Sequence, residues 1–245
     1  MIYVIWGCIC SFFIYAVDSV KRSLNSLSSG SNDNVEQVAE PSLSDFVLIL
    51  IAMVPLFLIG ALRFDVGTDY ETYLRYQIPY VLHGATDTVG PLYREVIKLG
   101  VGLGSTQFVF VITQLILVVA MAFAIYKMSS SYATSLFLFM FSTFFSFSLN
   151  VMRQSIATAV ALAAIYFLFH NKIVFVALSL AAISLHSSVI ILIIVMIVAL
   201  KKLPLGFYII TVPLMWLVAP ISYYLVQTFP WLLGRFSIIL ILVIL

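Results

Sequence analysis

The chain alternates between long apolar runs and short polar segments along its whole length. A helix needs about 20 apolar residues to cross a hydrocarbon core of roughly 30 Å. Because a backbone inside lipid must satisfy its own hydrogen bonds, we expect the runs to be helices. The pattern predicts helices at 2–17, 46–62, 105–126, 132–149, 151–169, 173–185, 187–200 and 205–228, with a last run at 236–245.

This pattern predicts an all-α fold, a polytopic transmembrane bundle of about eight to nine membrane helices. Composition agrees, because 63% hydrophobic and 9% charged residues leave too little polar surface for a water-soluble protein. We expect residues 1–245 to form a single integral membrane domain. The run at 236–245 reaches only about 15 Å, half of a bilayer, which suggests a truncated C-terminus.

Two polar segments separate the first runs. Residues 23–44 are rich in Ser and Asn and predict a flexible loop. Residues 63–104 predict a loop that contains an amphipathic helix. If each run crosses once, each side of the membrane receives six basic residues. On one side five of the six are lysines, and on the other side five of the six are arginines. Short lysine-bearing loops are typical of the cytoplasm, so we expect 23–44 inside and 63–104 outside.

The 28-residue stretch 173–200 is either one long helix or a hairpin with His186 at its tip. Lysines at both ends favour the hairpin. Each arm of about 14 residues would rise only some 21 Å, which would leave His186 recessed below the outer surface.

The first candidate site segment follows the second apolar run, from Arg63 to Tyr73. Thr68 and Glu71 have the spacing of a capping box, which predicts a short helix that starts at Asp69. We expect this helix to lie along the outer interface, anchored by Tyr70, Tyr73 and Tyr76. The alternative is a juxtamembrane helix whose charges merely meet water.

The second segment contains Asn150, Arg153 and Gln154 between two strongly apolar runs. If Asn150 caps the following helix, Arg153 lies in its first turn, where the helix dipole disfavours a cation unless an anion is present. A helix N-terminus with an arginine suits phosphate, and the arginine fork suits a pyrophosphate. The alternative is an arginine that extends toward lipid headgroups.

The third element is His186, a lone histidine in an apolar stretch. Such a residue is often only a packing residue, but burial in a membrane is expensive for an ionisable group unless it lines a wet cavity. No Asp or Glu follows Glu95, so any carboxylate chemistry must come from residues 63–95. No span carries the paired acids of a cation-coupled transporter, and no metal-binding motif occurs, so we expect no metal and no cofactor.

These elements, in this order, resemble the EpsG family of polysaccharide polymerases, which is related to Wzy-type O-antigen polymerases. The resemblance covers roughly residues 45–200. One departure is Gly90, because the family often has a glutamate at this place; Asp87 or Glu95 are the nearest substitutes. The residues that carry the resemblance are Arg63 with Val66-Gly67-Thr68-Asp69-Tyr70 and Tyr73, Asn150 with Arg153-Gln154 and Ala157, and His186-Ser187.

The resemblance implies a multi-pass protein of the bacterial cytoplasmic membrane, active on its outer face. Its activity would transfer a polyprenyl-pyrophosphate-linked glycan to an acceptor repeat unit during exopolysaccharide, capsule or O-antigen synthesis. The implied partners are this lipid-linked oligosaccharide, membrane lipids, and flippase and chain-length regulator proteins. A net charge of +2 on a membrane chain gives no indication of nucleic acid.

The resemblance also implies roles for individual residues. His186 or Asp69 would accept the proton of the acceptor, with His186 preferred because its reference pKa of about 6.5 suits a base near neutrality. Two other readings stay open, a transporter or flippase of a lipid-linked glycan, and a noncatalytic membrane subunit of a glycan assembly complex. The residues expected to bind the pyrophosphate are Arg63, Arg153, Gln154, Arg235 and Tyr70.

Overall fold

The computed structural model describes residues 42–67, 69–84, 89–141 and 143–199, with scattered positions between residues 9 and 19. The predicted runs at 205–228 and 236–245 lie outside these residues, as do Asp87, Arg235 and most of the predicted loop 23–44. The chain divides into two compact units, residues 1–193 and 194–245. Of the second unit, the structure describes only the end of one helix, and the fold below is that of the first.

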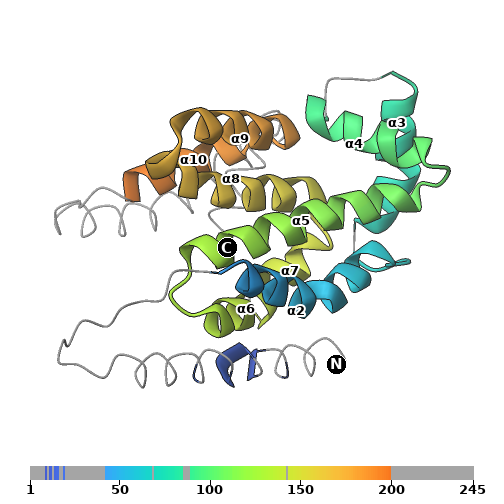
Figure 1. Cartoon of the computed structure of the whole chain (residues 1–245). Coiled ribbons are helices and arrows are strands. Elements are labelled where there is room, and N and C mark those ends of the chain that lie inside the picture. The colour runs from blue at the N-terminus through green and yellow to red at the C-terminus, as the bar shows by residue number, and fades with distance from the viewer. Residues whose placement is uncertain are drawn as a thin grey trace, which may run out of the picture. The chain divides into compact units, whose positions relative to one another are not determined.

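Every regular element among the described residues is a helix, which confirms the all-α membrane bundle (Figure 1). In the part of the chain that the structure describes, three helices are long and apolar enough to cross a membrane: α2 (Leu43–Ala61), α5 (Gln107–Met128) and α8 (Met152–His170). Their positions match three of the predicted runs. The shorter apolar helices are α6 (Tyr132–Phe141), α7 (Thr143–Ser148), α9 (Lys172–Leu185) and α10 (Val189–Ala199).

Helix α5 occupies the centre of the unit, with α2 packed on one side and α8 on the other (Figure 1). Helix α9 packs in turn on α8. The buried side of α8 is rich in alanine, which lets neighbouring helix backbones approach closely inside a membrane. The buried alanines of α8 are Ala157, Ala159, Ala161, Ala163 and Ala164.

Two glutamines of α5 fix the position of α2. Gln114 is buried and donates a hydrogen bond to Leu56 O at 3.2 Å, and Gly60 provides the space for its side chain. Gln107 donates to Ala61 O at 2.6 Å, so it satisfies a carbonyl at the C-terminus of α2. These bonds hold the residue that follows, Leu62, and the beginning of the first candidate segment beside the start of α5.

Helix breaks occur within one predicted run and at one place where a break was the favoured alternative. The predicted run 132–149 forms two helices, α6 and α7, rather than one. The stretch 173–200 contains the expected break, because α9 ends at Leu185 and α10 begins at Val189. One continuous helix through His186 is therefore wrong.

Helix α4 (Pro91–Gly102) lies within the segment predicted as a loop with an amphipathic helix. Because it contains charged residues and glycines, α4 does not form an apolar run in the sequence. It packs on α5 and on α9, so it belongs to the bundle.

The helix predicted near Asp69 is present, but its predicted aromatic anchoring is wrong for two of three tyrosines. It includes a π-helical segment η1 (Thr72–Gln77) followed by α3 (Ile78–Leu82). Tyr70 and Tyr73 are 3% and 6% exposed, whereas Tyr76 is 72% exposed. Three residues apart on a helix, the two buried rings face the same side and pack into the protein rather than into the interface.

Two glycines of α4 provide a matched test of this packing. A Cβ atom on Gly100 would lie 2.7 Å from Val109 N, whereas one on Gly102 would meet nothing within 4 Å. We expect Gly100→Ala to destabilise the protein by about 1–3 kcal/mol. Gly102→Ala should leave stability unchanged or raise it by up to about 1 kcal/mol. Thermal unfolding of both variants in detergent measures the difference, and equal midpoints would contradict the α4–α5 contact.

Candidate functional site

The first two candidate segments touch at Gly67. This residue has a φ of 96°, and a Cβ atom there would lie 2.7 Å from Asn150 Oδ1 and 2.9 Å from Leu149 O. Both the left-handed backbone and the close approach require glycine. The segment after α2 is therefore held against the junction of α7 and α8.

The third segment meets α4 at Gly90. A Cβ atom on Gly90 would lie 2.4 Å from Ser184 O and 2.8 Å from Leu185 O, at the end of α9. Any larger residue would displace this backbone, and His186 follows directly. The contact gives a steric reason for glycine at the place where a glutamate was expected by resemblance.

Arg63 ties the end of α2 to the start of α8. Its side chain is buried, and its guanidinium donates to Leu149 O and to the sulfur of Met152. The guanidinium carbon also lies 4.8 Å from the centre of the Phe110 ring. Burial lowers the pKa of Arg63, although nearby tyrosines oppose this effect. The structure thus uses Arg63 to join three segments of the chain.

Tyr70 is a packing partner in the same cluster. Its ring stacks on Phe110, with ring centres 5.0 Å apart and an interplanar angle of 20°, and it meets the edge of Phe64 at 6.1 Å. Tyr73 and Met152 complete this buried cluster.

Arg153 lies in the first turn of α8, as predicted, but the predicted cap is wrong. Val151 is the N-cap residue, and its side chain makes no capping hydrogen bond. The Asn150 amide instead donates backward to Ser146 O at 3.3 Å. The first N–H groups of α8 therefore lie beside the half-buried Arg153 without a side-chain cap.

Two tyrosines surround Arg153. The Arg153 side chain is hydrogen-bonded to Tyr73, and burial raises the Tyr73 pKa while Arg153 opposes the rise. Tyr93 of α4 is completely buried, and burial also raises its pKa. Its hydroxyl is buried and makes no hydrogen bond of normal geometry among the described residues.

His186 lies in the break between α9 and α10. Its Nδ1 receives a hydrogen bond from the Ser188 backbone N–H at 3.3 Å and lies 2.9 Å from the Ser188 hydroxyl. Because a backbone N–H can only donate, Nδ1 is the acceptor and the neutral ring carries its proton on Nε2. Burial, and secondly the charge of Arg153, lower the pKa of His186, which keeps the ring neutral at pH 7.

The remaining predicted site residues are half-buried, exposed or outside the described part of the chain. Asp69 and Gln154 are half-buried, and Asp69 acts electrostatically on Tyr73. Arg235 lies outside the described residues. Glu95, one possible substitute carboxylate, is exposed and paired with Lys98 at 2.8 Å. Within the described ranges, no three His, Cys, Asp or Glu side chains form a group that could hold a metal ion.

A sequence model of the EpsG family matches residues 46–243. The chain belongs to the EpsG family. This family consists of membrane proteins of the Wzy-like polysaccharide polymerase type, so the protein is a membrane protein of polysaccharide biosynthesis. No significant match was found among curated proteins or among solved structures.

The sequence analysis did not place two residues, Tyr73 and Tyr93, beside Arg153, where the structure has them. Tyr73 was expected at the interface but lies against Arg153. Tyr93 was not considered, because it reaches the site from α4, which no apolar run revealed. The signal for Tyr93 was the segment Gly90-Pro91, since a proline at the first position of a helix favours a helix start there.

Proposed function

We propose that this EpsG-family protein is a polysaccharide polymerase on the outer face of the bacterial cytoplasmic membrane. It would transfer a glycan from a polyprenyl-pyrophosphate carrier to a hydroxyl of an acceptor repeat unit. Membership of the family supports a role in polysaccharide biosynthesis. The proposal of glycan transfer from a diphosphate carrier rests on the grouping of Arg153, Tyr73 and His186 at the start of α8. The N-cap residue of this helix provides no side-chain cap.

In the proposed reaction, negative charge builds up on the departing diphosphate. The acceptor oxygen bonds to the anomeric carbon, the bond from that carbon to the diphosphate breaks, and the polyprenyl diphosphate leaves with the bonding electrons. A helix N-terminus and an arginine fork are suited to this anion, and such electrostatic stabilisation is often the largest contribution to catalysis. We therefore assign the departing diphosphate to Arg153, with Gln154 as a further contact.

Arg63 and Tyr70 receive supporting roles in this proposal. The guanidinium of Arg63 already donates to Leu149 O and the Met152 sulfur. It therefore holds the start of α8 in place and adds positive charge near the first turn of that helix. Tyr70 keeps that arrangement rigid through its stacking on Phe110.

The hydrogen bond at Nδ1 changes the role that we propose for His186. With its proton on Nε2, a neutral His186 is a hydrogen-bond donor, and its acceptor nitrogen is already occupied by Ser188. A neutral imidazole can stabilise a growing negative charge in this way. We therefore assign the acceptor's proton to Asp69, the half-buried carboxylate beside Tyr73.

Arg153→Lys tests the diphosphate contact. The substitution keeps the charge but removes the planar fork, so we expect a loss of about a hundred- to thousand-fold in rate. In a host without its own copy, single lipid-linked repeat units should accumulate while the amount of protein in the membrane stays normal. Arg75→Lys is the control, since Arg75 is exposed and forms an ion pair with Glu71, one helical turn earlier in the same segment. Long polymer of ordinary amount from Arg153→Lys would remove this residue from the site.

Two substitutions of His186 separate a donor from a base. His186→Gln keeps an N–H donor, so we expect most activity to survive, whereas His186→Leu should lose about a hundred- to thousand-fold. A donor works in both protonation states, so wild-type turnover should not fall as pH drops through the lowered pKa of His186. A loss of turnover below pH 6.5 that disappears in His186→Gln would instead identify His186 as the base.

Asp69→Asn tests the proposed base. It removes the proton acceptor with little change in size, so we expect a loss of about a hundred- to ten-thousand-fold in rate. Asp65→Asn is a matched control, because Asp65 is exposed and has a φ of 51°, a conformation that asparagine also adopts readily. Equal activity of the two variants in an assay of polymer formation would exclude Asp69 from proton transfer.

A further inference from the structure

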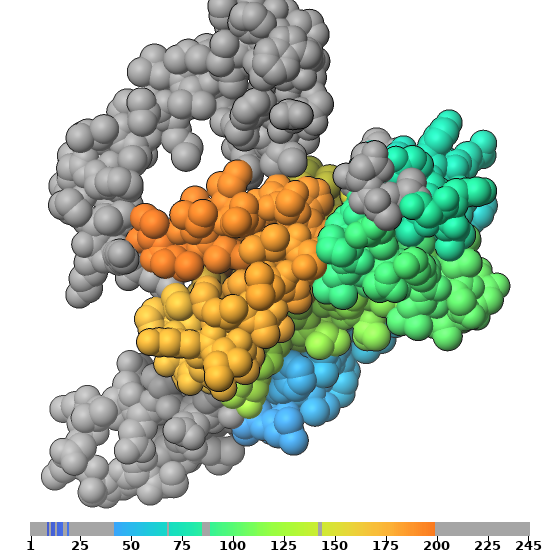
Figure 2. All heavy atoms as spheres, turned by 90° about the horizontal axis from the view of Figure 1, so that it is seen from above, coloured from blue at the N-terminus to red at the C-terminus, as the bar shows by residue number. Residues whose placement is uncertain are grey.

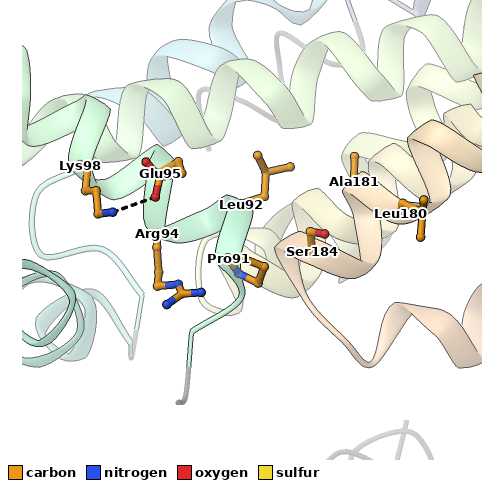
Figure 3. A pocket seen from close by; sticks show the side chains of 8 residues that line it. All are labelled: Pro91, Leu92, Arg94, Glu95, Lys98, Leu180, Ala181 and Ser184. Atoms are coloured by element: carbon orange, nitrogen blue, oxygen red, sulfur yellow. Dashed lines mark hydrogen bonds and ion pairs between the residues drawn. The ribbon is translucent and has the colours of Figure 1, made fainter. Parts of the chain in front are cut away.

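A groove runs between α4 and α9, outside the cluster of Arg153 and Tyr73. It is a shallow, largely open hollow with a volume of about 580 Å³. Leu92 on α4 and Ser184 on α9 lie on its two sides (Figure 3). The groove is lined by Pro91, Leu92, Arg94, Glu95, Lys98, Leu180, Ala181 and Ser184.

One end of the groove lies next to the proposed reaction centre. Pro91 and Ser184 line it, and the neighbouring Gly90 is packed against the backbone of Ser184 and Leu185. His186 follows directly. Helices α4 and α9 are neighbours on this face of the molecule (Figure 2). A ligand in the groove would therefore end beside His186.

The groove continues as an apolar surface along α4. A second hollow of about 630 Å³ shares Leu92, Glu95 and Lys98 with it and adds Leu99 and Leu103. These two leucines are 59% and 55% exposed. Apolar residues thus extend from Leu92 to Leu103 beside the Glu95–Lys98 pair, and an apolar surface of this length suits a long hydrocarbon chain better than a compact ligand.

The charges of the groove favour an anion at its end. Lys98 is paired with Glu95, so two cations and one anion leave a net positive charge. Arg94 makes no side-chain hydrogen bond or ion pair with the part of the chain that the structure describes. Arg94 is a half-buried residue that lines the groove, so its guanidinium can contact a phosphate beside the apolar wall.

From this arrangement we infer that the groove between α4 and α9 holds the isoprenoid chain of a polyprenyl diphosphate, with Arg94 contacting its phosphate end. The inference deepens the proposed function and rests on it for the choice of an isoprenoid over a phospholipid. Leu92, Leu180 and Ala181 contact the first isoprenoid units. This placement directs the diphosphate toward His186 and Arg153.

The test uses photolabelling of the full chain in membranes. The probe is a polyprenyl diphosphate with a photoreactive diazirine on its isoprenoid chain, and the label is mapped to peptides. We expect label on α4 and α9, displaced by unlabelled polyprenyl diphosphate but not by phosphatidylglycerol. Label elsewhere, or equal displacement by phosphatidylglycerol, would overturn the inference.

Two substitutions refine the result. Ala181→Trp fills the groove and should reduce labelling about tenfold or more, while Val176→Trp, at an exposed position of α9 that does not line the groove, should not. Arg94→Gln should weaken displacement by polyprenyl diphosphate but leave displacement by uncharged polyprenol unchanged. Unaltered labelling in both groove variants would contradict the assignment.

Polymer formation is measured in the same membranes, so the two proposals can fail separately. Polymer formation without labelling of α4 and α9 would support the polymerase activity and contradict the proposed lipid site in the groove. Labelling of α4 and α9 without polymer formation would support the lipid site and contradict the proposed polymerase activity.

Discussion

The buried guanidinium of Arg63 is the interaction on which the arrangement of the site depends. Arg63 follows α2 directly, and it reaches Leu149 O and Met152 at the other candidate segment. Removing a charge from water costs several kcal/mol unless hydrogen bonds compensate for it. Here a carbonyl, a sulfur and the face of Phe110 provide that compensation, with about 0.5–2 kcal/mol expected from the ring contact. Without it, the start of α8 would keep only the backbone contact at Gly67 with the segment that follows α2.

The same interaction leaves the site positively charged. No ion pair to Arg63 forms within the described ranges, and the ionisable groups that act on it electrostatically are tyrosines. The adjacent first turn of α8 adds the positive end of the helix dipole. A cationic site built from an arginine, tyrosines and a neutral histidine is suited to an anionic ligand, and the family places the protein within polysaccharide biosynthesis.

The sequence predicted the helices that are long and apolar, because crossing a bilayer imposes a minimum length and hydrophobicity. It also predicted the break at His186 and the position of Arg153 in a first turn. It failed for α4, where charges and glycines conceal a helix that only packing against α5 and α9 explains. It also failed for Asn150, because its amide has an alternative acceptor at Ser146 O that periodicity does not reveal.

Contacts between distant segments were the least predictable part of the site. The glycine positions Gly67 and Gly90 make sense only when Asn150 and Ser184 are seen against them. The burial of Tyr73 depends on Phe110 and Met152, which come from two other helices. Such contacts are set by the tertiary arrangement, so the sequence pattern could identify candidate residues but not their partners.

The central claim is that the grouped residues at the start of α8 support glycan transfer rather than transport of a lipid-linked glycan. The most direct measurement counts polyprenyl diphosphate released per new glycosidic bond when the full chain, in proteoliposomes, receives lipid-linked repeat units. The account predicts one diphosphate lipid released for each bond formed, at a rate that depends on the amount of protein. Movement of the lipid-linked units across the bilayer without any release would contradict it.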